Sequence, residues 1–385
     1  MPVRSRPATT TRGPPVTTAP GRRYRLISAD SHVNEPPDLW TRRVPAALRD
    51  RAPRIERFDE GDAWVIEGVA DPINFGMNAC AGLEPEAMRG WVRFEDIRRG
   101  GHDPAARLGE MDRDGVDAEV LYPTPRLAQA VFANPDAEYR AAMVAAYNDW
   151  IAEYVEYAPE RFGGLAMLPN WGAEAAVAEL DRSLDRPGMR GVVMGTYPNG
   201  SLQPDPTDDK VWGRLAERGV PLGIHVSLAS RMPTAHSAKL PGYGRFFDAP
   251  NRMIEMIFAG IFDRFPDLDV VFAEVDFGWV PYAKEQIDNN YHRLDPVSRF
   301  GLAANPSEYI ERHFHFGFMT DTFGIQNRHH VGVERVLWSN DYPHISADWP
   351  ESWRTIQAAF SGVPPEERQL ILAGNSQRLY GFGRD

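Results

Sequence analysis

Three polar residues around one strand end have the chemistry to bind a metal ion. They lie in residues 30–37, whose sequence is Asp-Ser-His-Val-Asn-Glu-Pro-Pro. The alternating, partly β-branched residues 25–32 predict a strand, which the two prolines terminate. Asp30 and His32 are two positions apart and therefore point to the same side of that strand, with Glu35 just past its end. Carboxylates and imidazoles are metal ligands; the alternative is a histidine bonded to a backbone carbonyl beside an aspartate that caps a turn.

Three further polar residues lie near the ends of other predicted strands. His225 is near the end of the fifth strand, Glu274 near the end of the sixth, and Asp341 ends the eighth. An ionised carboxylate within an apolar strand costs several kcal/mol unless it is paired or metal-bound. Taken singly, His225 fits a hydrogen-bonded core histidine and Asp341 fits a loop cap. Glu274 could pair with Arg126 or Arg252. Taken together, these residues favour a metal site.

Alternating strands and helices would bring these strand ends together. The predicted strands are 25–32, 118–123, 162–169, 191–196, 221–227, 269–275, 314–319 and 336–341. The predicted helices are 104–116, 135–157, 173–184, 208–218, 251–265, 279–291, 324–331, 349–360, 365–372 and 376–380. Near-continuous apolar strands are typical of a parallel sheet covered on both faces. Eight of them predict an α/β fold, a (β/α)8 TIM-like barrel with its active site at the carboxyl ends of the strands. The alternative is a doubly wound open sheet, but the chain has neither Gly-x-Gly-x-x-Gly after the first strand nor a Walker A sequence.

The domain organisation follows from composition along the chain. Residues 1–21 are rich in Pro, Thr and Arg and are expected to form a disordered tail. Residues 22–385 are expected to form one barrel domain. The segment 33–103 lacks clear periodicity and is predicted to be a long insertion that serves as a lid or a partner surface, with a short hairpin strand at 63–68.

Charge and composition exclude several functions. The net charge of −12 argues against nucleic acid as a partner, because a duplex-binding surface needs clustered Lys and Arg. The single cysteine, Cys80, excludes an intramolecular disulfide and a Cys-rich zinc site, and its neighbours favour a packing role. No apolar run is long enough for a membrane helix and no signal peptide is recognised, so we expect a cytoplasmic protein that does not bind membranes.

The strand-end residues resemble those of amidohydrolase family 2, which includes aminocarboxymuconate-semialdehyde decarboxylase and the resorcylate decarboxylases. The resemblance covers about 25–383 and rests on Asp30-x-His32, His225, the 272–274 stretch Phe-Ala-Glu, the 339–343 stretch Ser-Asn-Asp-Tyr-Pro and the closing 373–376 stretch. It implies the barrel fold and a divalent metal. The decarboxylases of this family carry a His at the sixth strand, beside a single divalent metal, where this chain has Glu274.

The ligand types suggest a dinuclear centre. Two imidazoles and four carboxylates match the ligand count of di-iron carboxylate proteins, and carboxylates can bridge two cations. The predicted metal ligands are Asp30, His32, Glu35, His225, Glu274 and Asp341. This set resembles the branch of the fold that contains the nonheme diiron monooxygenase of platensimycin and platencin biosynthesis. The predicted cofactor is therefore two iron ions, with a single zinc or manganese ion as the alternative.

The first functional hypothesis is a monooxygenase that uses dioxygen to hydroxylate a small hydrophobic acid, terpenoid-like or aromatic. The alternatives are a metal-dependent hydrolase with Asp341 as the general base, a non-oxidative decarboxylase with Asp341 or His344 handling the proton, and a non-catalytic scaffold. Glu274 and Asp341 are the candidate catalytic residues.

The small-molecule substrate is expected to contact residues from several segments. Arg126 is predicted to pair with a substrate carboxylate, and Tyr122 and Trp40 to exclude water. His344 is predicted to lie beside the metal ligands. A homodimer is expected, with the insertion as one contact surface.

Overall fold

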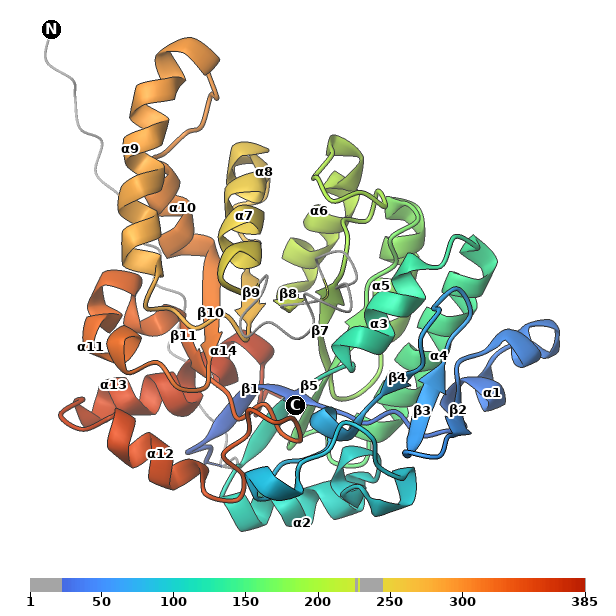
Figure 1. The fold of residues 1–385 in the computed structure, drawn as a ribbon. Coiled ribbons are helices and arrows are strands. Elements are labelled where there is room, and N and C mark those ends of the chain that lie inside the picture. Colours follow the sequence, from blue (N-terminus) through green and yellow to red (C-terminus); the bar gives the residue numbers. More distant parts are fainter. Residues whose placement is uncertain (1–22, 226–227, 229–244, 385) are drawn as a thin grey trace, which may run out of the picture.

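Eight parallel strands form one sheet that curves into a nearly closed barrel (Figure 1). The computed structural model describes residues 23–225, 228 and 245–384; the predicted tail, 1–21, and the end of the predicted fifth strand, 226–227, lie outside them. The strands, in their order around the sheet, are β1 (Ile27–His32), β5 (Ala118–Tyr122), β6 (Phe162–Met167), β7 (Met189–Met194), β8 (Leu222–His225), β9 (Val270–Ala273), β10 (Phe314–Phe318) and β11 (Val336–Trp338). The TIM-like barrel predicted from the sequence is confirmed.

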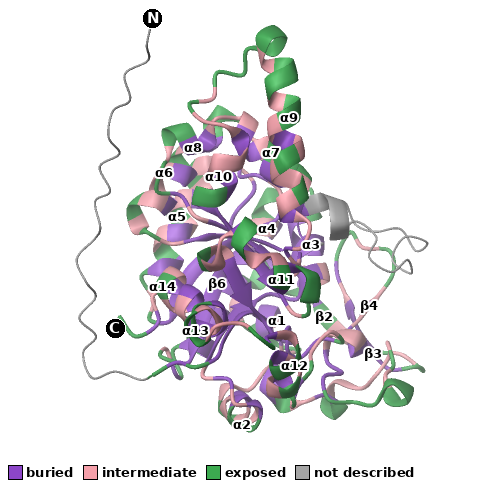
Figure 2. Cartoon of the chain, turned by 90° about the vertical axis from the view of Figure 1, so that its left-hand side faces the viewer, coloured by how far each residue is buried: buried purple, intermediate pink, exposed green. Residues whose placement is uncertain are grey.

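Helices cover the outside of the barrel and shield the strands from solvent. All residues of β1, β5 and β6, for example, are buried, as expected for a parallel sheet covered on both faces. Figure 2 shows the buried strands at the centre and the exposed residues on the helices around them. The helices are α1 (Leu39–Arg43), α2 (Pro104–Asp114), α3 (Pro125–Ala133), α4 (Ala137–Val155), α5 (Ala173–Leu184), α6 (Asp209–Arg218), α7 (Arg245–Phe258), α8 (Ile261–Arg264), α9 (Val280–Ser298), α10 (Pro306–His313), α11 (Thr322–Val331), α12 (Ser352–Ala359), α13 (Pro365–Gln369) and α14 (Asn375–Tyr380).

Three helical segments differ from the sequence-based expectation. Helix α3 was not predicted, because almost all of its residues are buried and it has no polar face that would reveal the helical period. The single helix predicted at 251–265 is broken by Gly260, whose φ of 66° is left-handed. Helix α10 was also not predicted, although Asn305 and Glu308 form a capping box at its start, which is a recognisable sequence signal.

The insertion after β1 is more regular than predicted. It contains a three-stranded antiparallel sheet of β2 (Arg54–Arg57), β3 (Asp62–Val65) and β4 (Ile73–Asn74), joined to short 3-10 turns. The hairpin strand expected at 63–68 corresponds to β3. No helix among the described residues is both long and apolar enough to cross a bilayer.

The barrel closes where β11 returns to β1. The ladder order begins at β1 and ends at β11, and these two strands are joined by backbone bonds just beyond β11 rather than by a regular ladder. Asp341 N donates to Asp30 O at 3.0 Å, and His32 N donates to Tyr342 O at 2.7 Å. The carboxyl end of the first strand is thus fastened directly to the residues that follow the last strand.

Candidate metal centre

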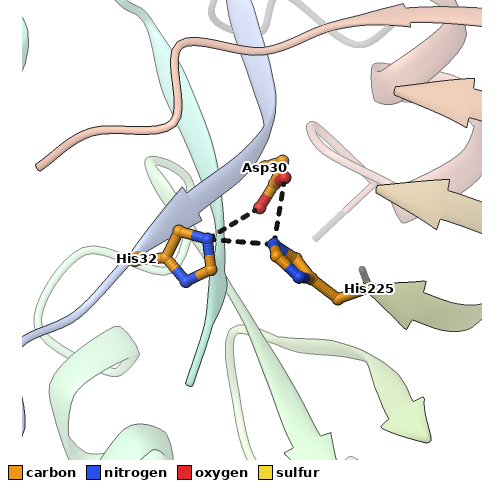
Figure 3. Close-up of side chains that lie close together, drawn as sticks. All are labelled: Asp30, His32 and His225. Carbon is orange, nitrogen blue, oxygen red and sulfur yellow. Dashed lines mark hydrogen bonds and ion pairs between the residues drawn. The ribbon is translucent and has the colours of Figure 1, made fainter. Parts of the chain in front are cut away.

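Four of the predicted ligands converge at the carboxyl ends of three strands. Asp30 and His32 come from β1, His225 ends β8, and Asp341 follows β11; all four residues are buried. Figure 3 shows Asp30, His32 and His225 pointing toward one another. The two imidazole Nε2 atoms are 3.1 Å apart. His32 Nε2 lies 3.4 Å from Asp30 Oδ1 and 3.3 Å from Asp341 Oδ1, and His225 Nε2 lies 3.5 Å from Asp30 Oδ2.

These distances fit ligands that share one cation. Metal–nitrogen and metal–oxygen bonds of about 2.0–2.2 Å place neighbouring ligand atoms roughly 3.0–3.5 Å apart. Within the described part of the chain, both carboxylate oxygens of Asp30 and Oδ2 of Asp341 are buried and accept no hydrogen bond of good geometry. Buried carboxylate oxygens without donors are costly unless a cation satisfies them. The donor set therefore fits a divalent cation.

The protonation of His32 also suits a metal ligand. Its Nδ1 lies 3.1 Å from the carbonyl oxygen of Pro123, which can only accept, so Nδ1 carries the proton and Nε2 presents a lone pair. Burial, together with the nearby His344, lowers the pKa of His32 to about 4. The imidazole is therefore neutral at physiological pH, which is the form that binds metals.

The residue His344 lies against this cluster. Its ring stacks on that of His32 with 3.9 Å between centroids and 12° between planes, and its Nδ1 is 3.1 Å from Asp341 Oδ1. Its Nε2 lies 3.2 Å from Asn78 Nδ2, which can only donate. His344 Nδ1 therefore carries its proton toward Asp341. Burial alone would lower the pKa of His344, but the carboxylate of Asp341 outweighs burial and raises it.

The same electrostatics act on Asp341. Burial alone would raise its pKa, but the neighbouring His344 lowers the pKa of Asp341 below its ordinary range. The backbone of Asp341 is left-handed, with φ of 52°, and so is that of Glu274, with φ of 62°. Such conformations are uncommon for residues other than glycine and occur where chains turn sharply at functional sites.

The carboxylate of Glu274 lies at the edge of the cluster. Glu274 follows β9, and its Oε2 is 3.9 Å from His225 Nε2. Its side chain is 15% exposed, whereas those of Asp30 and Asp341 are each 1% exposed. Glu274 therefore contacts the cluster from its more open side.

The predicted ligand Glu35 is not part of the cluster, which corrects the sequence-based set. Its Oε1 accepts from Thr124 N at 2.9 Å and its Oε2 from Thr124 Oγ1 at 2.6 Å. Glu35 is fully buried and ties the start of the insertion to the segment after β5. Both carboxylate oxygens already have donors, so Glu35 has a structural explanation that needs no metal.

The predicted substrate-contacting residues lie in different environments. Trp40 is buried in the core, where its Nε1 donates to Met143 O at 3.1 Å, and the role predicted for it in excluding water stays a prediction. Tyr122 is buried beneath the cluster, with its ring 5.4 Å from that of His225. Arg126 lies in the first turn of α3, and its Nε is buried without an acceptor among the described residues. Burial lowers the pKa of Arg126.

Sequence reasoning did not identify Asn78, which orients His344. Asn78 lies in the insertion, 266 positions from its partner. No local pattern marks a residue whose role depends on how an irregular segment packs over the barrel.

Comparison with known proteins identifies the family. The model of the amidohydrolase family matches residues 29–382. The chain is 29% identical over 254 residues to 2-amino-3-carboxymuconate-6-semialdehyde decarboxylase from Dictyostelium discoideum, covering 65% of this chain and 69% of that protein. It is 27% identical over 291 residues to gamma-resorcylate decarboxylase from Rhizobium sp., covering 71% and 86%.

Solved structures share the fold. An amidohydrolase from Mycobacterium avium subsp. paratuberculosis superposes with a TM-score of 0.73 at 22% identity, covering 94% of this chain and 98% of the other. A dihydroxybenzoic acid decarboxylase from Polaromonas sp., solved with manganese and 2-nitroresorcinol, superposes with a TM-score of 0.64 at 19% identity, covering 94% and 98%. With the family match over nearly the whole barrel, the conclusion is that this chain belongs to the amidohydrolase family and is one of its enzymes.

Proposed function

We propose that this enzyme holds a single divalent cation and removes carbon dioxide, without an oxidant, from a small carboxylic acid. The observation that carries the proposal is the convergence of Asp30, His32, His225 and Asp341, whose neighbouring donor atoms lie 3.1–3.5 Å apart. The named activities of two relatives, aminocarboxymuconate-semialdehyde decarboxylase and gamma-resorcylate decarboxylase, support the choice of reaction.

The arrangement favours one metal over the predicted pair of irons. Two catalytic metals typically lie about 3.5–4 Å apart and need further ligands around the second ion. Glu35 would have supplied one of those ligands, but both of its oxygens accept hydrogen bonds from Thr124. The ligand atoms of Asp30, His32 and His225 all lie within 4.8 Å of one another, as do those of His32, Asp341 and His344. This compact set suits a single zinc or manganese ion, which the sequence left as the alternative.

The residues of the site supply the steps that decarboxylation needs. When bound, the cation would act as a Lewis acid that fixes the substrate and stabilises negative charge. The bond between the carboxylate and its carbon breaks, carbon dioxide leaves, and the electron pair stays on that carbon, which must then gain a proton. His344 can supply this proton by way of Asp341, because its Nδ1 holds a proton 3.1 Å from Asp341 Oδ1.

Substrate binding would use the charged groups around the cluster. The guanidinium of Arg126, whose Nε is buried without an acceptor among the described residues, would pair with a second acidic group of the substrate. The buried ring of Tyr122 packs near that of His225 and would exclude water from that side of the site.

The test is metal stoichiometry combined with an anaerobic assay. We expect one zinc or manganese ion per chain, and carbon dioxide release from dihydroxybenzoates or related acids without oxygen consumption. Asp341→Asn should lower turnover by at least about 10²-fold. Two irons per chain with turnover that requires oxygen would instead support the monooxygenase, and a chain that binds no metal would refute the proposal.

Addition of water is the second candidate, and the carboxylate of Glu274 favours it. Glu274 Oε2 lies 3.9 Å from His225 Nε2, where it could act as a general base for a water molecule. The chain is also 28% identical over 294 residues to 2-keto-4-carboxy-3-hexenedioate hydratase from Sphingobium sp.. Isotope-labelled water separates the two reactions: a hydratase or hydrolase places solvent oxygen in the product, whereas a decarboxylase places solvent hydrogen on carbon.

A further inference from the structure

The barrel seam is defined here as residues 28–32 of β1 together with residues 340–342 that follow β11. It carries three of the four proposed ligands: Asp30 and His32 on one side and Asp341 on the other. Only two backbone hydrogen bonds between these segments are close to the ligands, Asp341 N to Asp30 O and His32 N to Tyr342 O. The distance of 3.3 Å between His32 Nε2 and Asp341 Oδ1 therefore depends on how the seam is held.

A fully buried arginine bridges this seam. Arg107 comes from α2, and its Nη1 donates to His32 O at 2.8 Å. Its Nη2 donates to Tyr342 O at 3.4 Å, and its guanidinium lies 4.4 Å from the centre of the Tyr342 ring. One planar group thus contacts the backbone of His32, a proposed ligand on β1, and the backbone of Tyr342, which follows the proposed ligand Asp341.

The charge of Arg107 is neutralised by Glu119 on β5. Arg107 Nε donates to Glu119 Oε2 at 2.6 Å, with both side chains no more than 2% exposed. A buried guanidinium requires such a partner, and its fixed fork of donors can serve acceptors on several segments at once. Lysine could keep the charge but not this geometry.

Polar side chains reinforce the seam from within. Asn340 Oδ1 accepts from Ser28 Oγ at 3.0 Å, from Ser31 Oγ at 2.9 Å and from Tyr342 N at 3.1 Å. Side-chain contacts here take the place of a regular ladder. The position of the ligands at the seam therefore depends on side-chain groups whose hydrogen bonds have specific geometry.

We infer that Arg107, held by Glu119, is a positioning residue that sets the spacing between the β1 ligands and Asp341. The inference rests on the proposed metal site. The bridge touches the backbone on both sides of the seam but not His225, so its loss would move one part of the ligand set relative to the other. Metal sites require ligand placement within about 0.5 Å, and loss of supporting contacts typically weakens metal binding about 10–100-fold.

The test compares Arg107→Lys with Arg161→Lys in the full-length chain loaded with Co²⁺. Arg161 is also buried and contacts a carboxylate and a carbonyl, those of Asp112 and Val116, but lies before β6 at the opposite end of the barrel. For Arg107→Lys we expect Co²⁺ affinity to fall at least tenfold and the visible spectrum of bound Co²⁺ to change. Arg161→Lys should change neither, even if it lowers the unfolding midpoint equally.

The outcomes separate the two proposals. If the unsubstituted chain binds no Co²⁺, the proposed metal site fails; if it binds Co²⁺ and Arg107→Lys keeps the same affinity and spectrum, the positioning role is overturned. Should Arg107→Lys not fold, Glu119→Gln keeps the shape and an acceptor for Arg107 Nε while removing the neutralising charge. An unchanged affinity and spectrum in Glu119→Gln would then overturn the inference, and a threefold or greater loss of affinity would support it.

Discussion

Substitution of Glu35 distinguishes a structural carboxylate from a metal ligand. In Glu35→Gln, the amide oxygen can accept from Thr124 N, as Glu35 Oε1 does at 2.9 Å. The Thr124 hydroxyl also lies 3.0 Å from Val33 O, so it can donate there and accept from the new amide NH₂. Every hydrogen bond then remains satisfied, and we expect the free energy of unfolding to change by no more than about 1 kcal/mol at pH 7.

Substitution by alanine should be much more costly. Glu35→Ala leaves the buried N–H of Thr124 without an acceptor and opens a cavity where the side chain was. An unsatisfied buried donor costs about 1–3 kcal/mol, and the cavity adds to it, so a total loss of about 2–4 kcal/mol is expected. Urea unfolding measures both variants, and metal analysis should find the same metal content per folded chain in each.

The pH dependence of stability gives an independent check on Glu35. Burial raises its pKa above the ordinary value of 4.5, although the Thr124 hydrogen bonds oppose this rise. Between these two pKa values the folded state binds more protons than the unfolded state, so the Glu35 contribution to stability increases as pH falls toward 4.5. Glu35→Gln lacks this term, and its stability relative to the unsubstituted chain should decline as pH falls from 7 to 5. Loss of metal from Glu35→Gln with unchanged stability would refute the structural role.

Three further predictions concern the open side of the site, the insertion and helix α2. Glu274→Gln should retain one metal ion per chain, measured by elemental analysis, and lower kcat at least about tenfold if Glu274 handles a proton. Gly76→Ala should destabilise the insertion by about 1–3 kcal/mol, because the added Cβ would lie 2.1 Å from Arg89 O. Gly109→Ala in α2, where an added Cβ meets nothing within 4 Å, should instead stabilise the chain by about 0.5–1 kcal/mol in urea unfolding. Equal effects of the two glycine substitutions would contradict this account.

The barrel and most of the cluster were predictable because both depend on strand ends. Apolar strands that carry polar residues near the carboxyl end are visible in the sequence, and barrel closure brings such ends to one rim. His225 and Asp341, separated by more than a hundred positions, could therefore be assigned to the same site as Asp30 and His32 before the fold was known. This assignment requires only that the carboxyl end of each strand is placed correctly in the sequence.

The residues outside strands could not be assigned in the same way. Glu35 has the right chemistry for a ligand and follows β1 closely, but its direction is set by Thr124, which lies 89 positions away. Trp40 likewise turns into the core because Met143 offers its Nε1 an acceptor. In irregular segments, where side-chain direction has no fixed period, the tertiary contacts decide which polar groups reach the site and which satisfy the backbone.

The charge balance explains why Glu274 matters for the reaction. A divalent cation held by Asp30 and Asp341, with two neutral imidazoles, has a net charge of zero, and the carboxylate of Glu274 would make it negative. A negative site repels an acidic substrate. The same charges act on His344, because the carboxylates of Asp341 and Glu274 both raise its pKa. Glu274→Gln removes one negative charge beside the substrate and one of the two carboxylates that raise the pKa of His344, so it should strengthen substrate binding and lower the pKa of His344.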